Sequence, residues 1–201
     1  MNDFLLITPP FIQPNTCYPA TPFLKGFLTQ QGFRVKQMDL SLETILHLFS
    51  EEGVAELFKK MAQHPAPLPI THKKMLKRKN EYGALIHPVI RFLQGTYPSF
   101  GPLINGGLLP KGDRYVLSAS SIDMLPPDDE QGKAKFLATI FIEDIADLIT
   151  LYMDENFGFS RYAEHIAYSP ANLHAIEKHL QKSTYITQCM CQLLDKAIHT
   201  H

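Results

Sequence analysis

Six residues lie where two predicted strands end near the N-terminus: Thr8, Pro9, Pro10, Phe11, Asp39 and Ser41. In open parallel sheets, ligands bind beyond the carboxyl ends of the strands, where the connecting loops diverge. These six residues therefore form the candidate binding site for a nucleotide-like group. We assign no catalytic residue and no metal ligand from the sequence.

A pair of carboxylates further along the chain could also carry chemistry. Glu143 and Asp147 are one helical turn apart, a spacing at which carboxylates can bind a metal ion or transfer protons. The polar side of an amphipathic helix explains both residues, so they receive no function. His174, Glu177 and His179 offer nitrogen and oxygen ligands, but on one helix their side chains cannot all face a single ion.

Three further motifs have simple structural explanations. The basic run at 72–79 could contact phosphate, but its lack of aromatic residues is typical of a solvated helix face. Asn105-Gly106-Gly107 is interpreted as a turn, because no lysine–serine pair follows it as in a phosphate-binding loop. Cys189 and Cys191 diverge on a helix and are interpreted as buried or half-buried thiols.

A predicted β-α-β unit in the first 40 residues positions the strand-end residues. The unbroken apolar run at 4–7 is typical of a strand buried on both faces, and Pro9-Pro10 ends it because proline cannot donate to a sheet. Thr21 can cap the next helix, and Pro22 suits its first turn.

The helix and the second strand of this unit are predicted from the spacing of apolar residues and from one glycine. Four apolar residues form a helical stripe: Phe23, Leu24, Phe27 and Leu28. Gly32 can adopt the left-handed conformation that ends a helix, and residues 34–39 follow as a second strand. A connection of this length favours parallel pairing with a right-handed crossover.

This unit resembles the start of the cobalamin-binding-type domain that precedes the catalytic barrel in B12-binding-domain radical SAM proteins. In that family a first strand ends in a Pro-Pro loop, a proline–aromatic turn leads into a helix, and a glycine precedes a second strand ending in Asp. The resemblance covers about one fifth of the chain. It rests on these residues: Pro9-Pro10, Tyr18-Pro19, Leu24, Leu28, Gly32, Val35 and Asp39.

The resemblance implies that cobalamin binds in the intact protein, held by loops and packing, and that its chemistry needs a downstream barrel. The chain has no Cys-x-x-x-Cys-x-x-Cys, and Cys17, Cys189 and Cys191 cannot form one. A [4Fe–4S] cluster and S-adenosylmethionine would therefore bind only in a domain beyond this chain. The Asp-x-His-x-x-Gly motif that gives cobalt a histidine in many cobalamin proteins is also absent.

The first functional hypothesis is thus an N-terminal, non-catalytic portion of an iron–sulfur oxidoreductase or methyltransferase-type radical SAM enzyme. It would help to cradle a corrinoid or dock the barrel. The alternative is a helical interaction or scaffold module on a degenerate α/β start. A small hydrolase or transferase is a third hypothesis, and the chain lacks a nucleophile pattern such as Gly-x-Ser-x-Gly.

We divide the chain into a β-α-β start at 1–40, helices and long loops at 41–132, and a helical subdomain at 133–201. In the middle region, helices are predicted over 41–50, 54–64 and 72–86, with a proline-rich connector at 64–69 and a break or kink at Pro88. Loops are predicted over 95–112 and 123–132, and a short strand at 115–117. In the last region, helices are predicted over 133–157, 159–168 and 169–182 and from Thr184 onwards.

The composition limits the partners and the compartment. The 19 basic and 20 acidic residues give no global attraction to nucleic acid or anionic membranes. Asp3 and the early prolines argue against a signal peptide, and acidic residues within 136–153 argue against a membrane span. Three cysteines without a disulfide pattern favour the cytoplasm.

The predicted fold is a helix-rich α/β chain with a short, incomplete Rossmann- or flavodoxin-like β-α-β unit. Because such a unit supplies only part of a ligand crevice, we expect the isolated chain to bind cobalamin weakly or not at all. Its unfinished apolar edge is expected to drive homo-oligomer formation.

Overall fold

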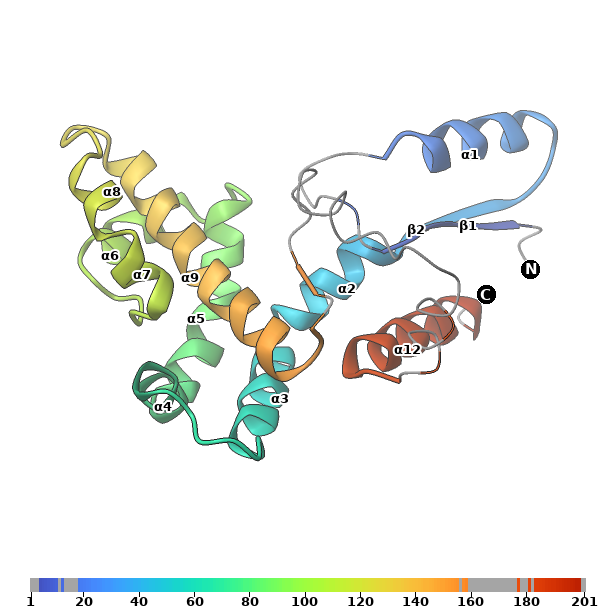
Figure 1. Cartoon of the computed structure of the whole chain (residues 1–201). Helices are drawn as coiled ribbons and strands as arrows, with labels where there is room; N and C mark the ends of the chain where they lie inside the picture. The colour runs from blue at the N-terminus through green and yellow to red at the C-terminus, as the bar shows by residue number, and fades with distance from the viewer. Residues whose placement is uncertain are drawn as a thin grey trace. The chain divides into compact units, whose positions relative to one another are not determined.

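The computed structural model describes residues 4–10, 12, 18–155, 157–158, 177, 181 and 183–199. The chain divides into two compact units (Figure 1). The first unit comprises Met1–His47 and Phe159–His201, and the second comprises Leu48–Gly158. Across the described ranges, no helix has the length and apolarity that crossing a membrane requires.

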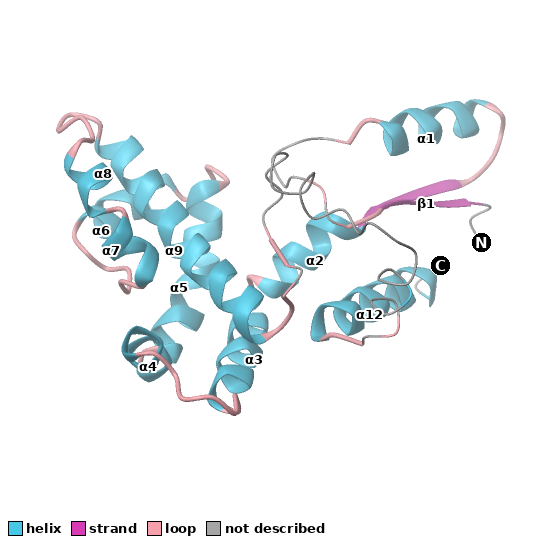
Figure 2. Ribbon diagram, viewed as in Figure 1, coloured by secondary structure: helices cyan, strands magenta, loops and turns pink. Residues whose placement is uncertain are grey.

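The first unit contains the predicted β-α-β arrangement. Strands β1 (Phe4–Thr8) and β2 (Val35–Asp39) pair in parallel, and α1 (Ala20–Gln30) connects them (Figure 2). The register runs from Phe4↔Val35 to Thr8↔Asp39, so both strands end at the same level. Gly32 follows α1 with a φ of 87°, a conformation that favours glycine. The helix-rich α/β fold class is confirmed.

Thr21 does not cap α1, which corrects the prediction from the sequence. The helix begins at Ala20 after Pro19, and no side chain caps it. Thr21 lies inside the first turn, where its hydroxyl is 3.1 Å from the hydroxyl of Thr8. The Gln37 side-chain amide also donates to the Thr21 hydroxyl, at 3.1 Å. The hydroxyl therefore ties α1 to both strands rather than to its own backbone.

Two more described helices belong largely to the first unit. The helix α2 (Leu40–Leu48) follows β2 directly, and α12 (Tyr185–His199) confirms the helix predicted from Thr184 onwards. The Tyr185 hydroxyl lies 3.5 Å from Nε2 of His47, which places the start of α12 near α2. Ile186 and Cys189 supply the buried side of α12.

In the described residues of the second unit, the regular elements are all helices joined by loops. This unit contains α3 (Glu51–Ala62), α4 (Ile70–Lys77), α5 (Lys79–Leu93), α6 (Gly101–Asn105), α7 (Asp113–Leu117), α8 (Ala119–Asp123) and α9 (Glu130–Tyr152), with a 3₁₀ turn at Pro98–Phe100. The long helix α9 packs against α3, α5, α6 and α7. Tyr82 lies at the centre of this unit. The centroid of its ring is 5.4 Å from the ring centroid of Phe58 and 5.3 Å from that of Phe141.

Two predictions for the segment between α5 and α9 are wrong. Residues 95–112, predicted as a loop, contain the 3₁₀ turn and α6, because Pro98 and Pro102 occupy first-turn positions where the missing N–H costs little. Residues 115–117, predicted as a strand, belong to α7. The aromatic and β-branched residues there favour a strand locally, but packing of α7 on α9 favours the helix.

Pro88 does not end its helix. The predicted helix over 72–86 is instead two helices that meet at Arg78, and the second, α5, continues through Pro88 to Leu93. Ile86, Val89 and Phe92 are each fully buried on one face of α5. The free energy that their burial contributes exceeds the cost of the one backbone hydrogen bond that proline removes.

The structure also groups the last third of the chain differently from the predicted subdomain at 133–201. Helix α9 belongs to the unit Leu48–Gly158, whereas Phe159–His201 belongs with the N-terminal residues. The buried side of α9 faces α3, α5, α6 and α7, which precede it in sequence, and this explains the grouping. The helices predicted over 159–168 and 169–182 lie outside the described residues, apart from positions 177 and 181.

Candidate functional site

The register of β1 and β2 brings the predicted strand-end residues to one edge of the sheet. Thr8 and Asp39 are directly paired, so the segments that follow them leave the sheet side by side. Thr8 is 1% exposed, and its hydroxyl shares a hydrogen bond with Thr21. This edge is where a parallel sheet places its ligands.

Asp39 and Ser41 organise the start of α2 at this edge. An Asp39 carboxylate oxygen accepts from the backbone N–H of Leu42 at 2.9 Å and so holds the first turn of the helix. The buried Ser41 hydroxyl accepts from the backbone N–H of Ile12 at 2.8 Å. Ser41 thereby fastens the chain that follows β1 to the chain that follows β2.

Five of the six predicted site residues are therefore described, and the structure gives them a common location. Pro9 is exposed and Pro10 is half-buried beside this edge, whereas Phe11 lies outside the described residues. The polar side chains of Thr8, Asp39 and Ser41 are all engaged in internal hydrogen bonds. Of these five residues Pro9 is the exposed one, so its ring is the surface that a ligand at this edge would meet first.

The second unit holds a polar cluster that the sequence analysis missed. Nδ1 of His72 is 2.6 Å from the Tyr152 hydroxyl, and Nε2 of His72 is 3.1 Å from a carboxylate oxygen of Asp113. Because an ionised carboxylate only accepts, Nε2 carries the donated proton, and in a neutral ring Nδ1 then accepts from the tyrosine. These two hydrogen bonds connect α4, α7 and α9.

Asp144 is the most deeply buried charge in this cluster. It is 3% exposed on α9, and its Oδ1 accepts from the backbone N–H of Arg114 at 2.8 Å. The backbone of Gly112 also hydrogen bonds to this carboxylate, while Oδ2 is buried without a hydrogen-bond partner. Burial raises the pKa of Asp144 to about 6, although the two backbone donors oppose this shift.

Gly112 is required for this arrangement. A Cβ atom built at position 112 would overlap the carboxylate carbon and both carboxylate oxygens of Asp144. The close approach lets the backbone amide of Gly112 reach the buried carboxylate. Only glycine can occupy this position without displacing Asp144.

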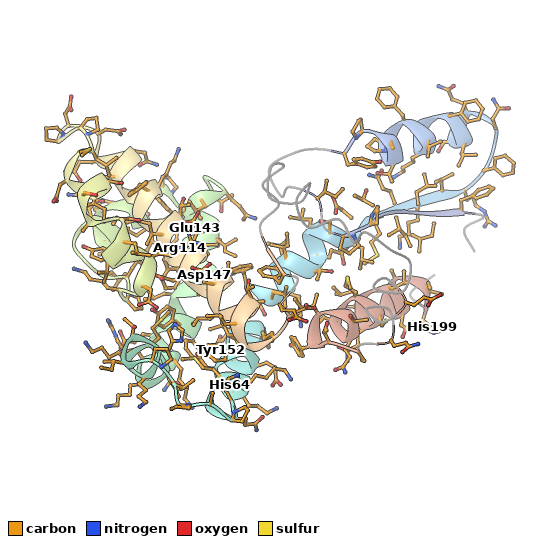
Figure 3. The ribbon with its side chains drawn as sticks, viewed as in Figure 1. His64, Arg114, Glu143, Asp147, Tyr152 and His199 are labelled. Atoms are coloured by element: carbon orange, nitrogen blue, oxygen red, sulfur yellow. The ribbon has the colours of Figure 1, made fainter. Side chains whose placement is uncertain are left out.

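Arg114 forms the exposed side of the cluster. Its guanidinium makes two hydrogen bonds to Asp147, of 2.6 and 2.9 Å, and lies 3.9 Å from a carboxylate oxygen of Glu143 (Figure 3). The hydrogen bonds to Asp147 hold the pKa of Arg114 above its ordinary value. Glu143 and Asp147 therefore serve an ion-pair network rather than standing alone on a solvated helix face.

A hollow of about 300 Å³ adjoins the cluster, and His72, Asp113, Asp144 and Asp147 contribute to its walls. Within the described ranges, no group of three or more histidine, cysteine or acidic residues is arranged to hold a metal ion. The cluster joins three helices through hydrogen bonds, and we interpret it as structural. Asp144 gave a signal in the sequence, because it shares the apolar face of α9 with Phe141 and Leu148.

The remaining sequence motifs do not converge on a site in the described structure. Asn105 donates to Glu130, and Gly107 takes a φ of 88°, which confirms a turn after α6. On α12 Cys189 is buried, as predicted, whereas Cys191 is exposed, which corrects the prediction of a buried or half-buried thiol there. His174 and His179 lie outside the described residues.

Comparisons with known proteins identify no relative of this chain. No family model matches the chain, and neither the curated proteins nor the solved structures contain a significant match.

Proposed function

We propose that this chain is the N-terminal, non-catalytic portion of a B12-binding-domain radical SAM protein, in which it forms one edge of a corrinoid site and docks the catalytic barrel. The observation that carries the proposal is the parallel pairing of Thr8 with Asp39. It brings both strand-end segments to one edge, where the resemblance of the first 40 residues leads us to expect the ligand.

The composition of the two strands supports a larger sheet. The strand β1 has no charged residue, as is typical of an interior strand of a parallel sheet, whereas β2 carries Lys36, as is typical of an edge strand. In this proposal the open edge of β1 receives the next strand of the complete domain. A two-stranded sheet alone is at best marginally stable in water.

The surface of α1 supports the same proposal. Phe23 is 78% exposed, Phe27 is 60% exposed and Leu24 is 49% exposed, on a helix whose one buried residue is Thr21. Contiguous apolar surface of this kind usually marks a contact with further protein. The remainder of the proposed domain would cover it.

The strand-end edge fits cobalamin as a packing surface. Pro9 and Pro10 would contact the corrinoid, and Asp39 and Ser41 would keep the two strand-end segments in place. When bound, cobalamin supplies radical chemistry that protein side chains lack. Neither Thr8, Asp39 nor Ser41 is suited to ligate cobalt, so the chain's own contribution is to bind and orient the ring.

The coding sequence that follows the codon for His201 tests this proposal. We expect the reading frame to continue and to encode Cys-x-x-x-Cys-x-x-Cys, the motif that would bind the cluster. A stop codon at that point would contradict the proposal and favour the alternative, a helical interaction module.

An exposed groove on the second unit, lined in part by Phe58 and Leu76, is the observation that favours this alternative.

A further inference from the structure

The second unit carries an exposed groove between α3 and the segment that joins α4 to α5. The groove measures about 560 Å³, and small or apolar residues form much of its lining: Ala55, Phe58, Ala62, Leu76 and Gly83. Lys59, Lys79 and Glu51 also line it, and Lys59 is paired with Glu56 at 2.9 Å. Lys79 is therefore the cation of the lining that a ligand can meet, and a ligand that places an apolar group in the groove and negative charge at Lys79 suits it.

Further lysines lie on α4, the helix that contributes Leu76 to the lining. Lys73, Lys74 and Lys77 are exposed there, and residues 57–80 contain no acidic residue, although Glu56 and Glu81 flank that range. Among the described residues, none of these three lysines, nor Lys79, forms an ion pair. The groove and these lysines together form a cationic surface with an apolar centre.

The connection between α8 and α9 has the complementary character. Asp123, Asp128, Asp129 and Glu130 are exposed there, and residues 115–132 contain no lysine or arginine. Met124 lies among these acidic residues and is 81% exposed. We call residues 123–130 the acidic tip.

The two surfaces cannot meet within one molecule. The acidic tip leads into the first turn of α9, and the opposite end of α9 lies toward α4 (Figure 1). Tyr152 in the last turn of α9 hydrogen bonds to His72 on α4. A helix of this length spans about 34 Å, which is several times the screening length of about 8 Å at physiological ionic strength. The acidic tip can therefore enter the groove only of another molecule.

We propose that the groove receives the acidic tip of a second copy of this chain, in a head-to-tail contact. Met124 of one molecule enters the apolar centre of the groove, and Asp123 and Asp128 face Lys77 and Lys79. Because the two surfaces differ, the contact is heterologous and builds a ring or an extended series rather than a twofold dimer. This contact does not use α1 or the strand-end edge, so it stands apart from the proposed corrinoid function.

Charge reversal on each surface tests the contact by sedimentation velocity of the full chain. We expect Lys77→Glu with Lys79→Glu, and separately Asp123→Lys with Asp128→Lys, each to weaken self-association about tenfold at low ionic strength. An equimolar mixture of the two variants should regain association, because each reversed surface then meets an opposite charge. Raising the salt concentration to about 0.5 M should weaken association of the unaltered chain.

Two controls separate this contact from general charge effects. Arg91→Glu with Lys135→Glu gives the same net charge as the first variant at exposed positions outside both surfaces and outside α1, and it should associate like the unaltered chain. Met124→Ser changes no charge and should weaken association about fivefold, because it removes the apolar group. If the mixture stays dissociated, if only the lysine variant has an effect, or if Met124→Ser has none, the second copy is not the occupant.

Discussion

Replacing Asp144 with asparagine should stabilise the protein at neutral pH. The carboxylate is 3% exposed, and burial raises its pKa from 3.8 to about 6. The folded state therefore holds the proton more tightly than the unfolded state, so the stability from this group is present below about pH 4 and is lost as the pH rises to about 6. A shift of this size corresponds to about 3 kcal/mol of lost stability at pH 7.

The Asp144→Asn side chain would keep one oxygen to accept from the backbone of Gly112 and Arg114, and the substitution would remove the buried charge. The new amide nitrogen would then occupy the position of Oδ2, which has no partner, and an unsatisfied donor costs about 1–3 kcal/mol. The expected net gain at pH 7 is therefore about 1 kcal/mol, with a much flatter dependence of stability on pH between about 4 and 6.

Urea unfolding followed by circular dichroism at pH 4.5 and pH 7 measures both effects. Asp147→Asn, on the same helix, serves as the matched control, because Asp147 is 45% exposed and its loss should cost less than about 1 kcal/mol without removing the pH dependence. If Asp144→Asn retains the pH dependence of the unaltered protein, or lowers stability at pH 7, the assignment of Asp144 as a buried, costly charge is wrong.

Three further predictions concern Gly112, Tyr152 and the exposed phenylalanines of α1. Gly112→Ala should lower the free energy of unfolding by about 2 kcal/mol, because its Cβ overlaps Asp144, whereas Gly26→Ala, with nothing within 4 Å, should not destabilise; urea unfolding measures both. Tyr152→Phe should cost about 1 kcal/mol in the same assay, because it removes the hydrogen bond to His72, and an unchanged stability would contradict that role. Phe23→Ser with Phe27→Ser should reduce self-association in light scattering at high salt concentration, where apolar contacts persist; equal scattering would show that α1 is not a contact surface.

The β-α-β unit could be predicted because its signals are local. The apolar run of β1, the prolines after it and the positive-φ glycine at Gly32 each act within a few residues. The helix α12 was predictable for the same reason, since Ile186 and Cys189 follow helical spacing. The strand-end residues could then be placed at one edge from parallel pairing alone.

The polar cluster could not be predicted because its partners are far apart in the chain. His72 meets Asp113 across 41 residues and Tyr152 across 80, and Asp144 meets Arg114 across 30. The helix at 113–117 was missed for a related reason, because packing on α9 overrides the local preference of Tyr115 and Val116 for a strand. The one sign of this cluster in the sequence was Asp144, an acidic residue within the apolar face of a predicted helix.

The most direct test of the proposed function is a paired titration with hydroxocobalamin, followed by its visible spectrum. One sample is the 201-residue chain, and the other is the protein encoded by the complete reading frame. Because the chain supplies one edge of the site, the longer protein should bind stoichiometrically and the shorter chain about a hundredfold more weakly. Tight binding by a monomeric form of the shorter chain, or no binding by the longer protein, would contradict the proposal.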